Sequence, residues 1–322
     1  MEKPLVFPSD PARLAKGYLI CIAATFSWAF TGIFIRYLTL NYQLSPLTLS
    51  FWRDVFVVFG LVVLFSIGNR ALLRPGGAGL RYFALYGLVV ALFNGFWSFS
   101  VALNGAAVAT VLAYSSAAFT VLLAWRLFRE PLTPIKMLAV GLGLAGCVLV
   151  SGAYAVTAWA LNPFGIVTGL CSGLIFAVYS LAGKYTAQLG INSWTALLYS
   201  FGFAALYFLP LSLLDGWMNG YTPSQTLFWL GERWLGWLAL FVLGIGPTIG
   251  GFGFYTLSLN YLQASSANLI AMMEPLITAL LAYLVLGERL SSPQLIGGAM
   301  ILSSVVILRL SEMRAASRPS LE

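Results

Sequence analysis

The chain of 322 residues contains no histidine, and charged residues make up only 8% of it. Histidine is the side chain that most often transfers protons and binds metals near neutral pH, so the commonest forms of that chemistry are excluded. The chain also has no phosphate-binding glycine loop, no HExxH and no GxSxG pattern. An ordinary soluble domain carries about 25% charged residues. The sequence therefore favours neither an enzyme nor a soluble protein, and no cofactor is expected.

Cysteine is also scarce, with three residues at positions 21, 147 and 171. All three lie within apolar stretches, and none belongs to a CxxC pair of the kind that binds metals or carries redox chemistry. Thiols in such surroundings usually serve as small core residues. We therefore assign no function to the cysteines.

Apolar residues make up 60% of the chain, and they are concentrated in long runs that give a mean hydropathy of +0.90. A helix needs about 20 apolar residues to cross the hydrocarbon core of a membrane. A β-barrel would need short segments of alternating polarity, whereas runs such as LITALLAYLVL are apolar on every side. The sequence therefore predicts an all-α membrane protein with ten transmembrane helices. The predicted spans cover residues 18–38, 47–67, 82–102, 106–127, 135–152, 164–183, 194–214, 235–256, 265–287 and 293–310.

The two halves of the chain repeat each other. The stretches LLAWRLFREPL (122–132) and LLAYLVLGERL (280–290) agree at five of eleven positions, and residues 17–37 align with residues 165–185. Each half holds five spans, and an odd number makes the second copy enter the membrane from the opposite side to the first. We therefore predict two inverted five-helix repeats, an arrangement that recurs in secondary transporters and places the substrate site between the halves. The predicted divisions are an N-terminal tail (1–16), a first repeat (17–152), a second repeat (163–310) and a C-terminal tail (311–322).

The basic residues predict the orientation in the membrane. Thirteen lysines and arginines fall on the side that holds both tails, against three on the other side, with Arg53 inside a span. Because cytoplasmic loops are enriched in lysine and arginine, we expect both termini in the cytoplasm and a multi-pass location in the plasma membrane, the inner membrane of a bacterium. The charges do not gather on one soluble surface, so no nucleic-acid partner is expected. The expected partners are a small-molecule substrate and the lipid bilayer, and the sequence does not distinguish a monomer from a homodimer.

These features resemble the EamA type of the drug/metabolite transporter superfamily over roughly residues 17 to 310. The likeness includes Trp28 in SWAF, Arg53 in FWRD and the pair Glu274 and Pro275 in MMEPL. The resemblance implies an exporter or exchanger of small metabolites that works by alternating access. The resemblance also implies a central cavity built by spans one to four and six to nine, with spans five and ten at the periphery. The family that the chain resembles includes exporters of amino acids, among them aromatic ones.

One departure from the family pattern concerns the fourth helix of each repeat, which often has a proline near its middle. The second copy has Pro275, whereas the aligned position in the first copy is Ala117. The sequence therefore does not predict a matched kink in both halves.

Glu274 is the deepest acidic residue, about 14 Å along its predicted helix and hence near the midplane. Acids at this depth are costly, face the bundle interior and often mark transport pathways. Pro275 cannot donate to the carbonyl of Ala271, which leaves an acceptor that could bind substrate or bend the helix. Handling of substrate or protons and stabilisation of helix packing both remain open for Glu274.

A group of polar aromatic and amide side chains also lies well inside the spans, away from the interfacial belt where such rings usually collect. A buried tyrosine or tryptophan needs a hydrogen-bond partner, which either a cavity or a neighbouring helix supplies. Together with Glu274, the predicted substrate-binding residues are Trp28, Asn94, Trp97, Tyr114, Tyr179, Tyr199, Tyr255 and Asn268.

Glycine and proline in span eight predict a hinge. Pro247, Gly250 and Gly251 can break the helix and expose backbone groups to a cavity, and with Pro275 they form the predicted hinge or gating set.

Four charged residues are predicted to be structural. Arg53 and Asp54 lie about 10 Å into span two, and we favour a tie between Arg53 and an acid on another helix over snorkelling or binding of a substrate carboxylate. Glu130 and Glu288 are repeat partners at the ends of spans four and nine, on opposite membrane faces. Each is expected to cap the next helix or to pair with a basic neighbour.

The sequence thus predicts a secondary transporter that exports or exchanges small organic metabolites, with amino acids of aromatic or other apolar character favoured. A sugar-phosphate or nucleotide-sugar exchanger is the alternative within the superfamily. It would need several cations in the cavity, and Arg53 is the only basic residue well inside a span. A channel or lipid scramblase is the alternative from another class, and it would need a continuous polar path.

Overall fold

The computed structural model describes residues 11–75, 79–155, 162–286 and 291–316, and every regular element in these ranges is helical. The elements are α1 (Pro11–Ala29), α2 (Thr31–Tyr42), α3 (Pro46–Gly68), the 3₁₀ turn η1 (Arg70–Leu73), α4 (Gly79–Tyr114), α5 (Ser116–Phe128), α6 (Pro134–Ser151), α7 (Pro163–Gln188), α8 (Ser193–Met218), α9 (Pro223–Leu227), α10 (Trp234–Leu243), the π-helical segment η4 (Gly244–Thr248), α11 (Ile249–Ser258), α12 (Ala264–Ala271), α13 (Glu274–Leu286) and α14 (Ser292–Ala316).

Ten segments within the described residues are long and apolar enough to cross a membrane. The first repeat supplies α1 with α2, then α3, the first part of α4, the end of α4 with α5, and α6. The second repeat supplies α7, α8, α10 with α11, α12 with α13, and α14. The predicted all-α fold with ten transmembrane helices is therefore confirmed.

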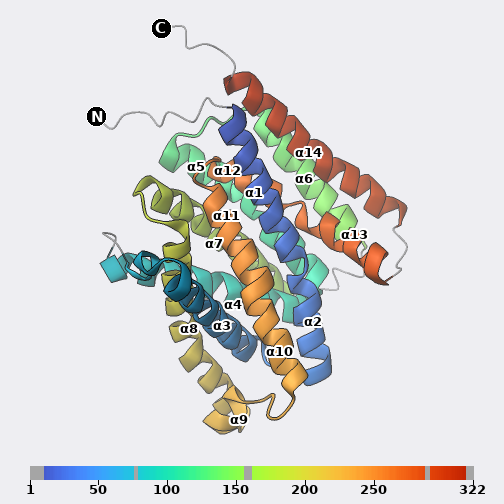
Figure 1. The fold of residues 1–322 in the computed structure, drawn as a ribbon. Helices are drawn as coiled ribbons and strands as arrows, with labels where there is room; N and C mark the ends of the chain where they lie inside the picture. Colours follow the sequence, from blue (N-terminus) through green and yellow to red (C-terminus); the bar gives the residue numbers. More distant parts are fainter. Residues whose placement is uncertain (1–10, 76–78, 156–161, 287–290, 317–322) are drawn as a thin grey trace.

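The helix contacts between the two repeats have the pattern that a pseudo-two-fold axis produces (Figure 1). Helix α1 packs on α11, and α4 packs on α7; these two contacts are exchanged when each span is replaced by its partner in the other repeat. Three further contacts, α3 with α8, α5 with α12 and α6 with α14, each join a span to its own repeat partner. The contacts of α4 with α8 and of α5 with α7 have their counterparts in those of α3 with η4 and of α1 with α12 and α13. The set of contacts thus maps onto itself, as two inverted repeats require.

Helix α4 carries two of the ten spans and changes direction between them. Ser100 and Leu112 both approach the position of a Cβ on Gly169 of α7, to 2.7 Å and 2.6 Å. Twelve residues of straight helix would separate those two side chains by about 18 Å. The bend returns the chain along α7, so the third and fourth spans lie against the same helix.

Spans one, four and nine are interrupted near their middles. Phe30 separates α1 from α2, Ser115 separates α4 from α5, and Met272 and Met273 separate α12 from α13. The interruptions at Ser115 and at Met272 and Met273 are repeat equivalents, although only the second repeat has a proline beside it. Both halves therefore contain a matched break, which the sequence did not predict.

A serine, and no proline, lies at the break in the first repeat. The backbone N–H and the hydroxyl of Ser115 both donate to the carbonyl oxygen of Leu112, at 3.1 Å and 2.6 Å. These short-range bonds compete with the regular helical pattern. In the second repeat Pro275 occupies the first turn of α13, where a missing N–H costs little.

Span eight contains the π-helical segment η4 around Pro247. Proline removes the N–H that would bond to the carbonyl of Leu243, and the hydroxyl of Thr248 donates to that oxygen instead, at 2.8 Å. The segment is thus a locally satisfied bulge in a continuous span rather than an open break.

The neighbouring glycines of α11 allow close contact with α1. A Cβ on Gly251 would lie 2.2 Å from Cδ1 of Trp28, and a Cβ on Gly250 would lie 2.9 Å from Oγ of Ser27. Both glycines therefore serve close packing of α11 on α1. Their role as a hinge remains a prediction.

Helices α6 and α14 lie side by side at the edge of the bundle (Figure 1). Gly146 and Gly297 face each other there, so that a Cβ on either one would come within 2.6 Å or 2.7 Å of the other's carbonyl oxygen. Only glycine permits backbones to approach this closely.

Candidate functional site

A cavity of ≈ 100 Å³ lies between the two repeats. It is bordered by spans one to four of the first repeat and by spans six, eight and nine of the second, whereas the peripheral helices α6 and α14 contribute no described lining residue. The first repeat contributes Trp28, Thr31, Ile35, Arg53, Phe93, Asn94, Trp97, Thr110, Ala113, Tyr114 and Ser116. The second repeat contributes Phe176, Phe252, Ala271 and Glu274.

The helix interruptions place side chains at this cavity. Trp28 and Thr31 flank the break in span one, Tyr114 and Ser116 flank the break in span four, and Glu274 follows the break in span nine. Because each interruption redirects the chain, residues on both sides of it can face the same space. The site thus lies where three spans depart from regular helix.

Glu274 joins the two repeats at the cavity. Its Oε2 accepts a hydrogen bond of 2.6 Å from the hydroxyl of Tyr114, which comes from the first repeat. Its Oε1 has no hydrogen-bond partner among the described residues. One oxygen of the carboxyl group is therefore held by the protein, and the other is available to a solute.

Among the described lining residues, Arg53 is the one with a basic side chain, and only 4% of its surface is exposed. Its Nε and Nη2 both donate to Oδ1 of Asp54, at 3.0 Å each, so the guanidinium folds back on its own neighbour rather than on an acid of another helix. Nη1 of Arg53 has no partner among the described residues. The second carboxyl oxygen of Asp54, Oδ2, is buried and also unpaired.

Aromatic rings form the apolar wall of the cavity. Trp28 packs edge-on against Phe176 and Phe252, with ring centroids 5.9 Å and 5.1 Å apart, and Phe93 packs on Phe176 at 5.0 Å. Trp28 and Phe176 are aligned positions of the two repeats, so equivalent helices meet here through rings. Such edge contacts add to the stabilisation from burial alone.

Five of the nine predicted substrate-binding residues line this cavity: Trp28, Asn94, Trp97, Tyr114 and Glu274. The other four are not among the lining residues, and their polar groups bond to protein groups. The hydroxyl of Tyr179 bonds to Thr256 at 2.8 Å, and that of Tyr255 to Ser180 at 2.7 Å.

Tyr199 and Asn268 also bond to protein groups. The hydroxyl of Tyr199 donates to the carbonyl of Leu73 at 2.7 Å, at the end of η1. Asn268 accepts from Ser116 at 2.9 Å and donates to Thr120 at 3.0 Å, which ties span nine to span four. For these residues the structure favours the helix-packing alternative that the sequence left open.

Sequence reasoning missed several lining residues. Phe93 and Phe252 are typical of any apolar span, and nothing in the pattern distinguishes a ring at a cavity from one in the core. Two others carried a usable signal, because Phe176 is the repeat partner of Trp28 and Ser116 is the repeat partner of Glu274. Under a pseudo-two-fold axis, the partner of a midplane residue also lies near the midplane.

The contacts of Tyr199 lead to a first testable prediction. Replacing Tyr199 by phenylalanine should lower the free energy of unfolding by about 1 kcal/mol, because one partly buried hydrogen bond to the Leu73 carbonyl is lost. The apparent KM of the transported solute should not change. Both are measurable on purified protein, and a raised KM would place Tyr199 in the pathway after all.

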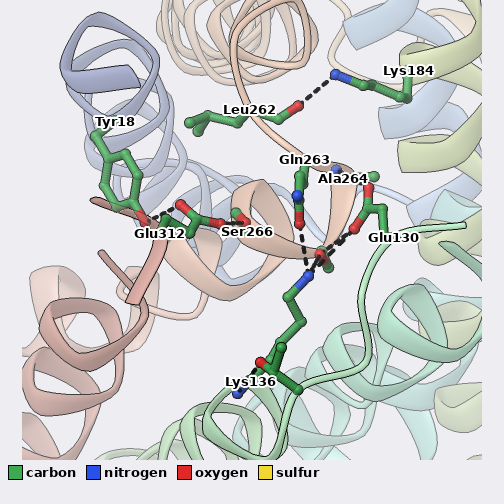
Figure 2. Close-up of polar contacts among 11 residues, drawn as sticks. Tyr18, Glu130, Lys136, Lys184, Leu262, Gln263, Ala264, Ser266 and Glu312 are labelled. Carbon is green, nitrogen blue, oxygen red and sulfur yellow. Dashed lines mark hydrogen bonds and ion pairs between the residues drawn. The ribbon is translucent and has the colours of Figure 1, made fainter. Parts of the chain in front are cut away.

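Glu130 is not among the residues that line the cavity, and it belongs to a cluster of polar contacts (Figure 2). Its Oε1 accepts a 3.0 Å hydrogen bond from the N–H of Ala264, the first residue of α12, and its Oε2 accepts from the hydroxyl of Ser265. Lys136 pairs with it at 3.6 Å. Glu288, its repeat partner, lies outside the described residues.

Two comparisons of sequence agree with this architecture. Residues 15–152 and 163–310 each match the model of the EamA-like transporter family. An uncharacterized transporter of Archaeoglobus fulgidus is 29% identical over 278 residues, which cover 86% of this chain and 90% of the relative. The uncharacterized inner membrane transporter YicL of Salmonella typhimurium is 25% identical over 315 residues, which cover 94% of this chain and 97% of the relative.

A crystal structure shares the fold. It superposes with a TM-score of 0.75 over 94% of this chain and 99% of its own length, at 20% sequence identity.

Proposed function

The chain belongs to the EamA-like transporter family, and from this premise we propose that it exports or exchanges amino acids with aromatic or other apolar side chains. The solute crosses by alternating access, with the two repeats as the bodies that rock around the central cavity. The plan of inverted repeats with a site between them supports this mechanism.

One observation carries the choice of substrate. Among the described lining side chains, one charged donor and one charged acceptor have no partner in the described part of the chain: Nη1 of Arg53 and Oε1 of Glu274. A zwitterion offers a carboxylate to the first and an ammonium group to the second. Charge-assisted hydrogen bonds of this kind are stronger than neutral ones, and the planar guanidinium suits a carboxylate.

The rest of the wall suits an apolar side chain. Trp28, Phe93, Phe176 and Phe252 surround the two charges with rings. At ≈ 100 Å³ the cavity is smaller than the roughly 300–1,000 Å³ of typical ligand sites. A bound amino acid therefore requires the walls to move apart, which motion of the repeats against each other would provide.

Highly anionic solutes fit less well. A sugar phosphate or nucleotide sugar needs several cationic partners, whereas Arg53 is the basic residue among the described lining side chains and already neutralises Asp54. This supports the less anionic substrate class.

We also propose a location in the plasma membrane with both termini in the cytoplasm. The thirteen basic residues on the side of the termini, against three opposite, support the orientation. The relative from Salmonella typhimurium is named an inner membrane transporter, which supports the location.

A panel of solutes in proteoliposomes tests the proposed function. We expect saturable uptake of phenylalanine or leucine, accelerated when unlabelled solute is trapped inside, and no comparable uptake of glucose 6-phosphate. The acceleration by trapped solute distinguishes a carrier from a channel, because only a carrier shows counterflow. Single-channel currents, or uptake of the phosphate without uptake of any amino acid, would contradict the proposal.

A further inference from the structure

The polar cluster of Figure 2 contains Tyr18, Glu130, Lys136, Ser265, Ser266 and Glu312, and some of its residues share helices with cavity residues. Along α1, Tyr18 belongs to the cluster and Trp28 to the cavity; along α12 and α13, Ser265 belongs to the cluster and Glu274 to the cavity. The ten residues from 18 to 28 span about 15 Å of helix. The cluster is thus a second polar layer, stacked on the cavity along the bundle axis.

Charged side chains of the first repeat bind the start of α12 in the second. Lys136 Nζ donates to Oε1 of Gln263 at 2.7 Å and to Oγ of Ser265 at 2.9 Å. Glu130 accepts from the backbone of Ala264 and from the same Ser265 hydroxyl. Ser265 therefore bonds both members of the ion pair, and every one of these hydrogen bonds crosses from one repeat to the other.

A second link crosses between the repeats beside the first. The hydroxyl of Tyr18 in α1 donates to Oε2 of Glu312 in α14, at 2.8 Å, while the other oxygen of Glu312 accepts from Ser266 in α12. Lys184, the remaining charge in Figure 2, bonds to the carbonyls of Leu259 and Leu262 within its own repeat.

A layer with almost no solvent exposure separates this cluster from the cavity. Cys21 and Tyr255 are 0% exposed, Tyr179 is 1% exposed, and Ala267 is 0% exposed. The thiol of Cys21 lies against the carbonyl of Ala267 at 3.4 Å, so α1 and α12 are in direct contact here. The bundle is therefore closed at the end that carries the cluster.

The repeat partner of the cluster differs in charge. Lys136 aligns with Gln294, which donates to the carbonyl of Val150 at 3.5 Å. The second repeat thus has no lysine at the position from which Lys136 pairs with Glu130. The repeat-equivalent positions of Lys136 and Ser265 therefore differ in chemistry, because Gln294 and Ala107 occupy them.

We propose that Tyr18, Glu130, Lys136, Ser265, Ser266 and Glu312 form a latch that keeps this end of the carrier shut. This latch rests on the proposed function, in which the repeats move against each other. It names the contacts that this movement must break. Removing one partner of a buried ion pair leaves the other charge uncompensated, so single substitutions weaken the closed state strongly.

Cys21 supplies a native probe for the test. In a variant in which Cys147 and Cys171 are replaced by serine, Cys21 is the one thiol left, and it lies behind the latch. We expect a membrane-impermeant thiosulfonate, added on the latch side, to modify Cys21 at least tenfold faster in Lys136→Met and in Glu130→Gln than in the parent. Inside-out and right-side-out vesicles distinguish the two sides.

The matched control is Gln294→Met, the same replacement at the repeat-equivalent position, which should leave the rate at the parent value. Unchanged labelling in correctly folded Lys136→Met and Glu130→Gln, or acceleration from the opposite side alone, overturns the latch. If those variants fail to fold, Tyr18→Phe removes a single hydroxyl and should still raise the rate about threefold; an unchanged rate there overturns it as well. Labelling needs no substrate, so accelerated labelling without amino-acid flux would keep the latch and reject the proposed solute.

Discussion

Transport of an amino acid should fall about 10- to 100-fold when Glu274 is replaced by glutamine. The substitution keeps the shape of the side chain and a group that Tyr114 can still bond, but it removes the negative charge from the cavity. A charge-assisted hydrogen bond contributes about 1.5–3 kcal/mol, which corresponds to this loss. Initial rates of uptake into proteoliposomes, at solute concentrations below the KM, measure the effect.

A des-amino analogue is the control for this prediction. The analogue of phenylalanine that lacks the ammonium group has nothing to bind at Glu274, so Glu274→Gln should not reduce its transport. Equal loss for both solutes would show that Glu274 acts on the conformational cycle and not on recognition. Unchanged transport of the amino acid itself would remove Glu274 from the site.

The second large effect concerns stability at the periphery of the bundle. Gly146→Val should lower the free energy of unfolding by up to about 3 kcal/mol, because a Cβ there would lie 2.6 Å from the carbonyl oxygen of Gly297 and backbone atoms cannot move aside singly. The unfolding temperature of the protein in detergent, followed by tryptophan fluorescence, measures the change.

Gly141→Val in the same helix is the matched control. A Cβ at Gly141 meets no atom within 4 Å, so this variant carries the intrinsic cost of valine in a helix without the clash. Equal unfolding temperatures for the two variants would mean that α6 and α14 can separate freely.

The fold could be predicted because its causes are local or repetitive. The length of each apolar run, the likeness of residues 122–132 to residues 280–290 and the odd number of spans per repeat suffice for ten helices in two inverted copies. The same repeats predict that the site lies between them. Glu274 could be identified because burying an acid at the membrane midplane costs free energy whichever way its helix faces.

The composition of the site was harder to predict, because it depends on which partner each side chain meets. Tyr114 and Tyr255 are equally deep and equally apolar in context, yet one reaches Glu274 and the other Ser180. Arg53 was expected to seek an acid on another helix, but a long side chain can fold back on Asp54 despite the angle between neighbours. No spacing rule distinguishes these outcomes before the helices are packed.

The sequence did not predict the helix break at Ser115, for a related reason. Proline is a strong sign of an interrupted helix, and Ala117 stands where the first repeat would carry it. The hydroxyl bond of Ser115 accompanies the break but could not have predicted it, because Ser172 and Ser304 make the same bond to the carbonyl three residues back within unbroken helices.

The hydrogen bond between Tyr114 and Glu274 has a thermodynamic consequence. Its donor belongs to one repeat and its acceptor to the other, so its strength depends on their separation. A solute that binds the same carboxyl group competes with this internal donor and favours the arrangement in which the donor has withdrawn. Linkage then requires that solute occupancy shifts the balance of conformations by the same factor by which the conformation alters solute affinity.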